Sequence, residues 1–263
     1  MEMLSQNQKR TLYSVSIPLL LSALIFGIGF INITYNTSAT ASTGIQIGMF
    51  APHTKTLMPV INNHLNSNDK AISFRTTNLN TYQIEKRVLL AQSFTAINHA
   101  IIKANSNPKP IQYIGYDNEA NNGALSTPYS ELVNPAASTN KAAEMVHSAG
   151  YKFAATPTRS ILLKEYQGVQ WAKVDMLVMQ LQKITHRPSK FTNIANQVSN
   201  YVKGHNPNTL VYVQVNPTLD TISNIVNDIN SIRDTIDGVS IVCKTSNGCT
   251  PIVLNQLLIA LGR

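Results

Sequence analysis

Short apolar runs of strand length alternate with longer amphipathic segments along most of this chain, and this alternation restricts the possible folds more than any other feature. It is typical of β-α-β units, in which helices connect parallel strands. We predict strands at 45–50, 71–76, 111–116, 151–155, 175–182, 210–215 and 238–244. We predict helices near 53–65, 81–105, 139–149, 162–172, 189–203, 219–235 and 251–262. Runs that are apolar on both faces, such as 210–213, favour a parallel sheet covered by helices.

The predicted fold class is α/β, and the predicted architecture is a (β/α)8 TIM-type barrel. Seven strand–helix units can be counted, one fewer than a complete barrel needs. Either the region 124–137 contains an additional element, or the barrel is trimmed or incomplete. A doubly wound open sheet is the alternative, but its nucleotide-binding versions need a G-x-G-x-x-G or Walker loop, and the sequence has neither.

Several predicted helices have recognisable ends. Ser138 to Asn140 are suited to start the helix at 139–149, and Gly150 is suited to end it. Pro251 fits the first turn of the last helix.

The N-terminus has the pattern of a signal peptide or an uncleaved membrane anchor. Lys9 and Arg10 precede an apolar run from Ile17 to Ile33, and Ala39-Thr40-Ala41 is a small-x-small cleavage site. We therefore expect residues 1–41 to be a leader or anchor with a polar spacer, and residues 42–263 to be a single barrel domain. Positive charges before the apolar segment place the rest of the chain outside the cytoplasm, either extracellular or on the cell surface.

The charge pattern argues against a nucleic-acid partner. The formal net charge is +8, but the basic residues are scattered and no aromatic-basic motif is present. Charged residues make up only 13% of the chain, and Asn, Ser, Thr and Gln supply much of its polarity. This composition favours an exported protein that could carry glycans over a nucleic-acid binder. The expected partner, a carbohydrate or a cell-envelope polymer, follows from polar residues at the ends of the predicted strands, and membrane contact would come through the N-terminal segment if it is not cleaved.

The only cysteines are Cys243 and Cys249. In an exported protein this spacing favours a disulfide that closes a short loop, with free thiols as the alternative. A metal site is disfavoured, because two cysteines without a flanking histidine lack the four ligands of structural zinc, and the histidines show no metal-ligand spacing. We predict no metal and no cofactor.

Two carboxylates, Asp117 and Glu119, follow the apolar and aromatic strand at 111–116. Side chains two positions apart in an extended segment point to the same side, so the two acids should share one face. In a β/α barrel that face belongs to the loop-lined mouth at the carboxyl ends of the strands, where such folds keep their chemistry.

Polar residues also follow the other predicted strands. Together they could bind a polyhydroxyl ligand, since amides and charged groups can donate to or accept from hydroxyls. The alternative is that strands simply enter solvent through polar residues. The candidate substrate-binding residues are Tyr116, Arg159, Gln180, Gln182, Gln214, Asn216 and Lys244, with Tyr113, Tyr116, Trp171 and Tyr212 as candidate apolar surfaces for sugar rings.

The acidic strand resembles that of family 18 glycoside hydrolases, the chitinase-like barrels, whose pattern is D-x-x-D-x-D-x-E. The resemblance puts Glu119 at the proton-donor position and Asp117 at the neighbouring aspartate, while Gln112 and Gly115 replace the two upstream aspartates. The segment 174–182 is similar to a later substrate-contacting strand of that family, with glutamines in place of Tyr-Asp. Residues 111–263 also resemble a broader group of exported bacterial and archaeal barrels with a Y-D-x-E strand, a Q-x-Q strand and a late cysteine pair, for which we know no settled activity.

These patterns predict a glycoside hydrolase-like barrel that acts on or binds an extracellular carbohydrate. Glu119 is the expected general acid, and Asp117 is expected to raise the pKa of Glu119 by like-charge repulsion. No separate nucleophile follows the obvious strands, so cleavage would depend on the N-acetyl group of the substrate. The alternative is a non-catalytic cell-surface barrel with a glycan-binding or structural role.

Overall fold

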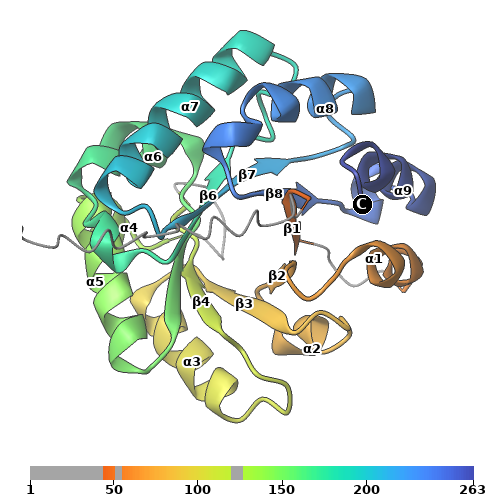
Figure 1. Ribbon diagram of the computed structural model, residues 1–263. Helices are drawn as coiled ribbons and strands as arrows, with labels where there is room; N and C mark the ends of the chain where they lie inside the picture. The colour runs from red at the N-terminus through yellow and green to blue at the C-terminus, as the bar shows by residue number, and fades with distance from the viewer. Residues whose placement is uncertain (1–43, 51–54, 120–126) are drawn as a thin grey trace, which may run out of the picture. The chain divides into compact units, whose positions relative to one another are not determined.

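The computed structural model describes residues 44–50, 55–119 and 127–263, and places eight parallel strands in a closed barrel surrounded by helices (Figure 1). Ala41–Arg263 forms one compact unit. The strands are β1 (Gln46–Phe50), β2 (Lys70–Ser73), β3 (Lys86–Ala91), β4 (Tyr113–Tyr116), β5 (Lys152–Ala155), β6 (Met176–Gln180), β7 (Leu210–Val215) and β8 (Gly238–Val242).

Each strand pairs in parallel with the next one in the sequence, and β1 pairs with β8 to close the ring. Gln46 lies opposite Gly238, and Phe50 lies opposite Val242. The predicted (β/α)8 barrel is therefore confirmed and complete, and the open-sheet alternative is wrong.

The eighth strand is β3, which lies within the segment predicted as a helix at 81–105. Only the second half of that segment is helical, as α3 (Phe94–Asn105). Leu90, Phe94, Ile97 and Ile101 recur at helical spacing, so the strand pattern merged with that of the following helix. The described part of 124–137 contains the short helix α4 (Tyr129–Leu132) and the start of α5, and no strand.

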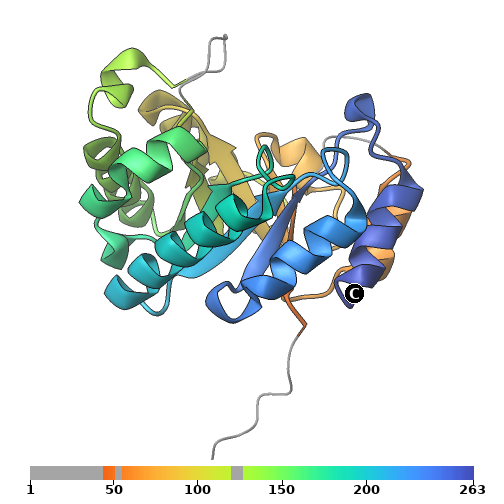
Figure 2. The same ribbon diagram turned by 90° about the horizontal axis from the view of Figure 1, so that it is seen from above.

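The remaining helices lie outside the ring of strands, and Figure 2 shows several of them along its outer side. They are α1 (Met58–His64), α2 (Thr76–Leu79), α5 (Pro135–Ser148), α6 (Arg159–Glu165), α7 (Pro188–His205), α8 (Ile222–Ser231) and α9 (Pro251–Ala260). The second half of the segment predicted as a helix at 162–172 contains two short 3-10 turns, Tyr166–Gly168 and Trp171–Lys173.

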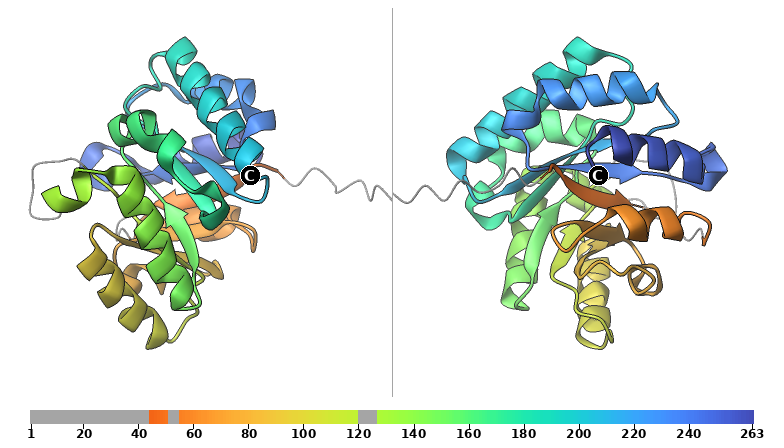
Figure 3. Two further views of the ribbon diagram at one scale, coloured as in Figure 1. Left: turned by 90° about the vertical axis from the view of Figure 1, so that its left-hand side faces the viewer. Right: turned by 45° about the vertical axis from the view of Figure 1, so that its right-hand side comes forward.

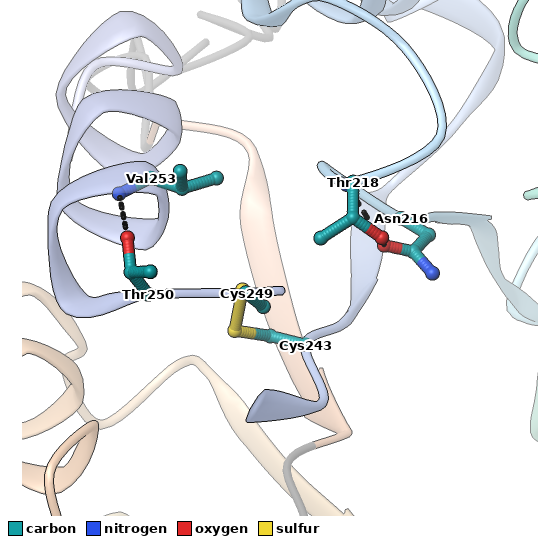
Figure 4. Close-up of a disulfide and its surroundings, with 6 residues drawn as sticks. All are labelled: Asn216, Thr218, Cys243, Cys249, Thr250 and Val253. Carbon is teal, nitrogen blue, oxygen red and sulfur yellow. Dashed lines mark hydrogen bonds between the residues drawn. A yellow bond between two sulfur atoms is a disulfide. The ribbon is translucent and has the colours of Figure 1, made fainter. Parts of the chain in front are cut away.

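The predicted helix ends were partly right. Gly150 follows α5 with a positive φ of 81°, and Pro251 lies in the first turn of α9, whose cap Thr250 accepts a hydrogen bond from the backbone N–H of Val253 (Figure 4). The predicted start of α5 near Ser138 is wrong. The helix begins four residues earlier than predicted, at Pro135, and Asn134 caps it by accepting from the backbone N–H of Ala137.

Two apolar layers hold the barrel together. In β3, Val88 and Leu90 pack inside the ring, whereas Leu89 and Ala91 pack against the helices. This alternation is the period of two expected of a strand. Outside the ring, α1 and α9 run next to one another (Figure 3), and His64 Nε2 lies 2.7 Å from Asn255 Oδ1.

The interior near the start of the strands contains a buried polar cluster. Lys70 Nζ donates to Tyr212 Oη at 2.5 Å and to Gln46 Oε1 at 2.9 Å, and Tyr212 Oη donates to the same Gln46 oxygen at 2.7 Å. Tyr212 also explains Gly238, because a Cβ at that position would lie 2.3 Å from the tyrosine ring.

Cys243 and Cys249 form a disulfide after β8 (Figure 4), as predicted. This bond is compatible with an extracellular location. The proposed leader at 1–41 lies outside the described residues, and among those described no helix is both long and apolar enough to span a membrane.

Candidate functional site

A cavity of about 740 Å³ opens at the carboxyl end of the barrel. Every strand contributes a lining residue at or near its end, and the eight residues are Phe50, Ser73, Gln92, Asp117, Thr156, Gln180, Gln214 and Val242. The predicted pair, Asp117 and Glu119, lies on this one cavity. The carboxyl end of the strands is where β/α barrels carry their ligands, because the loops there can vary without disturbing the core.

Asp117 is almost completely buried, with 4% of its surface exposed, and accepts three side-chain hydrogen bonds. Its Oδ1 accepts from Gln180 Nε2 at 2.8 Å and from Thr156 Oγ1 at 2.9 Å, while its Oδ2 accepts from Gln92 Nε2 at 3.4 Å. Strands β3, β5 and β6 therefore hold one carboxylate in place.

Glu119 is half-buried and more open to the cavity than Asp117. Its Oε2 accepts from Gln92 Nε2 at 3.1 Å, so the same amide group contacts both acids. Its backbone N–H donates to Thr127 Oγ1 at 2.9 Å, which fixes the chain just beyond β4.

The electrostatic environment acts most strongly on Asp117. Burial and, secondarily, repulsion by Glu119 raise the pKa of Asp117 to about 7, while its hydrogen bonds oppose the rise. From the sequence we expected a raised pKa on Glu119. The raised pKa that the structure supports is that of Asp117, whose carboxylate is almost completely buried.

Four of the seven predicted substrate-binding residues line the cavity, namely Gln180, Gln182, Gln214 and Lys244. Three do not. Tyr116 points toward the helices and donates from Oη to Glu131 Oε2 at 2.9 Å. Arg159 begins α6, and Asn216 is buried with its Oδ1 accepting from the backbone and hydroxyl of Thr218 (Figure 4).

The predicted aromatic surfaces do not line the cavity either. Tyr113 and Tyr212 pack in the barrel interior. Trp171 packs in the layer under the helices, with its Nε1–H donating to the carbonyl of Tyr166. The aromatic side chains that do line the cavity are Phe50 and Phe74, whose rings meet edge to face with centroids 5.9 Å apart.

Sequence reasoning also missed Gln92 and Thr156. Gln92 follows β3, so it was lost together with that strand. Thr156 directly follows β5, and the alternation of a strand places it on the same side as Ala154, which packs inside the ring. That spacing was the available signal.

Two buried polar atoms on the cavity have no hydrogen-bond partner among the described residues. They are the side-chain oxygens of Gln182 and Ser240. An unpaired buried oxygen costs free energy, on the order of 1–3 kcal/mol. Both oxygens are buried from solvent, so they are unsatisfied groups beside the cavity rather than open contacts for a ligand.

The acids near the cavity are few. The chain has 13 acidic residues, and the segments 51–54 and 120–126, which lie outside the described part, contain none of them. Of the residues that the structure describes, only Asp117 and Glu119 place a carboxylate on this cavity. Within the same part of the chain, no group of three or more His, Cys, Asp or Glu side chains could hold a metal ion.

Comparisons with known proteins identify solved barrels but no family. No family model matches the chain, and no curated protein matches it. The structure is similar to N-(5'-phosphoribosyl)anthranilate isomerase from Pyrococcus furiosus, with 12% identity, 83% of this chain and 98% of that chain covered, and a TM-score of 0.49.

Two other solved structures show similarities of the same order. Triosephosphate isomerase from Bartonella henselae has 10% identity, 84% and 100% coverage and a TM-score of 0.44. The endo-beta-1,4-mannanase from Thermotoga petrophila has 7% identity, 71% and 60% coverage and a TM-score of 0.43. These neighbours differ in the activities that they are named for, and the likenesses indicate nothing about the chemistry of this chain.

Proposed function

We propose that the cavity binds an extracellular carbohydrate and that Asp117 and Glu119 act on it as a general acid pair, as in a glycoside hydrolase. The observation that carries the proposal is a buried carboxyl with a pKa of about 7 beside a second, more open carboxyl in one cavity. Hydrolysis of a glycosidic bond needs an acid that keeps its proton near neutrality.

In the proposed reaction the two acids have different tasks. Near neutral pH the two acids share one proton, which the raised pKa of Asp117 retains. The proton passes to Glu119, the more open of the two acids, and from Glu119 to the glycosidic oxygen as the bond to the sugar carbon breaks. The water that hydrolyses the sugar intermediate then returns a proton to the pair. Gln180, Gln182 and Gln214 would bind sugar hydroxyls, and Phe50 and Phe74 offer apolar surfaces for the sugar ring.

The positive charge that develops on the sugar needs a nucleophile or a stabilising group. Apart from Asp117 and Glu119, no described residue places a carboxylate on the cavity. Most glycosidases have carboxylates on both sides of the scissile bond, and that arrangement is not available here. An acetamido group on the sugar could supply the nucleophile from the substrate itself. We therefore propose N-acetyl sugars as the first substrates to test.

A non-catalytic glycan-binding barrel is the second candidate, and Gly115 favours it. The family 18 pattern places an aspartate there, but a Cβ at Gly115 would lie 2.4 Å from Leu90 Cδ2. The side chain of Leu90 fills the space that the aspartate would need. The upstream aspartate that would adjust the pKa values of Asp117 and Glu119 is therefore absent, whereas Asp117 and Glu119 themselves are retained.

One experiment tests both candidates. The full-length chain, kept in mild detergent, is titrated with chito-oligosaccharides and other glycans, and the products are measured for the wild type and Glu119→Gln. Turnover that Glu119→Gln abolishes supports catalysis, and binding without turnover in both proteins supports the second candidate. If neither binding nor turnover occurs with any glycan, the carbohydrate proposal is wrong.

The location and the partner remain part of the same proposal. We propose that the leader exports the domain that carries the cavity. Outside the cytoplasm, that domain could meet a cell-envelope polymer as its ligand. Mass spectrometry of the exported protein, showing whether residues 1–41 are retained, distinguishes a secreted barrel from an anchored one.

A further inference from the structure

We infer that the cavity takes an anionic glycan, one whose sugars carry carboxylate, sulfate or phosphate groups. This inference rests on the proposed function and specifies its ligand. It is based on three basic side chains that line the cavity together with the acidic pair, namely Arg75, Lys103 and Lys244.

The three cations come from separate elements. Arg75 follows β2, Lys103 lies in the last turn of α3, and Lys244 follows β8. They reach the cavity from different parts of the chain, so one helix face or one run of sequence does not explain their position. A charged group of a ligand could contact more than one of them.

None of the three forms an ion pair with a described residue, and no acid is available in the neighbouring segments 51–54 and 120–126. Several basic residues elsewhere do form ion pairs, although others in the described part of the chain do not. Lys173 pairs with Glu144 at 2.6 Å, Lys203 pairs with Asp237 at 2.6 Å, and Arg263 pairs with Asp69. The cations on the cavity therefore keep their full capacity for an anionic ligand.

A second hollow, of about 310 Å³, lies between β3 and α3 and adjoins the main cavity. Phe74, Gln92 and Lys103 line both spaces. His99, one helical turn before Lys103, lines the second one. A ligand longer than one sugar could continue from the acidic pair over α3, where it would meet Lys103 and the imidazole of His99.

Charge also sets the orientation of such a ligand. Glu119 and Asp117 would repel an anionic group placed beside them, whereas the glutamines there accept neutral hydroxyls. The anionic groups of the ligand therefore belong next to the lysines and Arg75, and its neutral hydroxyls next to the acids. Contacts between charged partners are stronger than neutral ones.

The test is isothermal titration calorimetry of the full-length chain with three probes of similar length. They are a neutral chito-oligosaccharide, an oligogalacturonate and a sulfated oligosaccharide derived from heparin, each at low and high salt. We expect the wild type to bind an anionic probe at least about tenfold more tightly than the neutral one. The two anionic probes separate carboxylate from sulfate recognition.

Lys103→Met combined with Lys244→Met should remove most of this preference, because only Arg75 remains of the three cations, and should leave the affinity for the neutral probe within about twofold of the wild type. Lys103→Met and Lys244→Met alone should each lose part of the preference for anionic probes. These single variants keep the test valid if the double variant does not fold. Lys164→Met is the matched control, because Lys164 is a highly exposed lysine on α6 that does not line the cavity.

Equal wild-type affinity for neutral and anionic oligosaccharides, or an anionic preference that the double substitution leaves undiminished, would overturn the inference and leave the carbohydrate proposal standing. Binding of an oligoglutamate peptide with no binding of any oligosaccharide would overturn the carbohydrate proposal, and the glycan inference with it.

Discussion

The side-chain amide of Gln180 donates a 2.8 Å hydrogen bond to Oδ1 of Asp117 and so connects β6 to the acidic end of β4. The same Nε2 also donates to the carbonyl of Thr156 at 2.8 Å, which fixes the glutamine. A donor held in this way stabilises the charged form of the acid, and therefore opposes the effect of burial on its pKa.

Gln180→Met should raise the pKa of Asp117 further above its ordinary value, because a donor to the carboxylate is lost while burial is unchanged. The measurement is the carboxyl carbon shift of Asp117 followed by NMR across pH. Gln214→Met is the control, since Gln214 lines the same cavity but does not hydrogen-bond to the carboxylate of Asp117. An unchanged titration in Gln180→Met would contradict the assigned role of this hydrogen bond.

Asp117→Asn should stabilise the protein at neutral and alkaline pH. The pKa of Asp117 is about 7 in the folded protein and near 4 in the unfolded chain, so the folded state binds more protons between these values and wild-type stability falls as pH rises through that window. The advantage of Asp117→Asn should grow from pH 4 to 7, to on the order of 3 kcal/mol. Urea unfolding at four pH values checks this expectation.

Lys70→Met tests the buried lysine at the other end of the barrel. Burial, aided by Lys86, lowers the pKa of Lys70 to about 8. The unfolded chain therefore binds more protons than the folded one between about pH 8 and 10.5, and this group makes wild-type stability rise with pH across that range. Lys70→Met should remove the rise and be close to neutral or stabilising at pH 7, because Tyr212 and Gln46 still pair. If the free energy of unfolding of Lys70→Met rises with pH as much as that of the wild type, Lys70 is not the cause of the rise.

Gly115→Ala should destabilise the fold by about 1–3 kcal/mol, since the new Cβ meets Leu90. Adding Leu90→Ala should relieve the overlap, so that the double variant is more stable than the sum of the two single effects predicts. Gly204→Ala in α7 is the control, because nothing lies within 4 Å of its added Cβ. Chemical denaturation of the wild type, the two single variants Gly115→Ala and Leu90→Ala, the double variant and Gly204→Ala measures these free energies of unfolding. If the two single effects simply add in the double variant, the prediction is wrong.

Replacing both cysteines by alanine should lower the free energy of unfolding by about 2 kcal/mol, as the loss of a short closed loop predicts. Because Lys244 lies inside that loop, the change should also weaken binding of anionic probes more than that of neutral ones. Thermal melts and calorimetry measure the two effects separately. Equal weakening for both kinds of probe would show that the loop does not position Lys244.

The sequence was sufficient to predict seven of the strands and the closed barrel, because strand-length apolar runs such as 210–215 are separated from helices by clear turn residues. It failed at β3, where no glycine or proline separates the strand from α3 and the apolar residues keep helical spacing across the junction. The charges of Lys86 and Arg87 are typical of an exposed helix face. In the structure Arg87 is buried, and its guanidinium donates to the carbonyls of Leu79, Glu85 and Tyr82.

The candidate site was predictable where it depends on strand periodicity. Asp117 and Glu119 share a cavity because they are two positions apart, and Gln180 and Gln182 do so for the same reason. Tyr116 could not share it, since an adjacent residue on a strand faces the opposite side. The positions of Gln92 and Phe74 on the cavity could not be predicted, because Gln92 follows the undetected strand β3 and Phe74 lies in the loop after β2. The raised pKa of Asp117 could not be predicted either, because it depends on burial, which single-sequence patterns do not measure.

The pairing of β1 with β8 makes the first and last strands neighbours, although nearly the whole domain separates them in the chain. A nascent chain that does not yet include Gly238–Val242 has two open sheet edges and an incomplete barrel. Such an intermediate would be prone to stick to other strands. Ligand affinity should therefore appear abruptly, with the arrival of the final strand, rather than build up during synthesis.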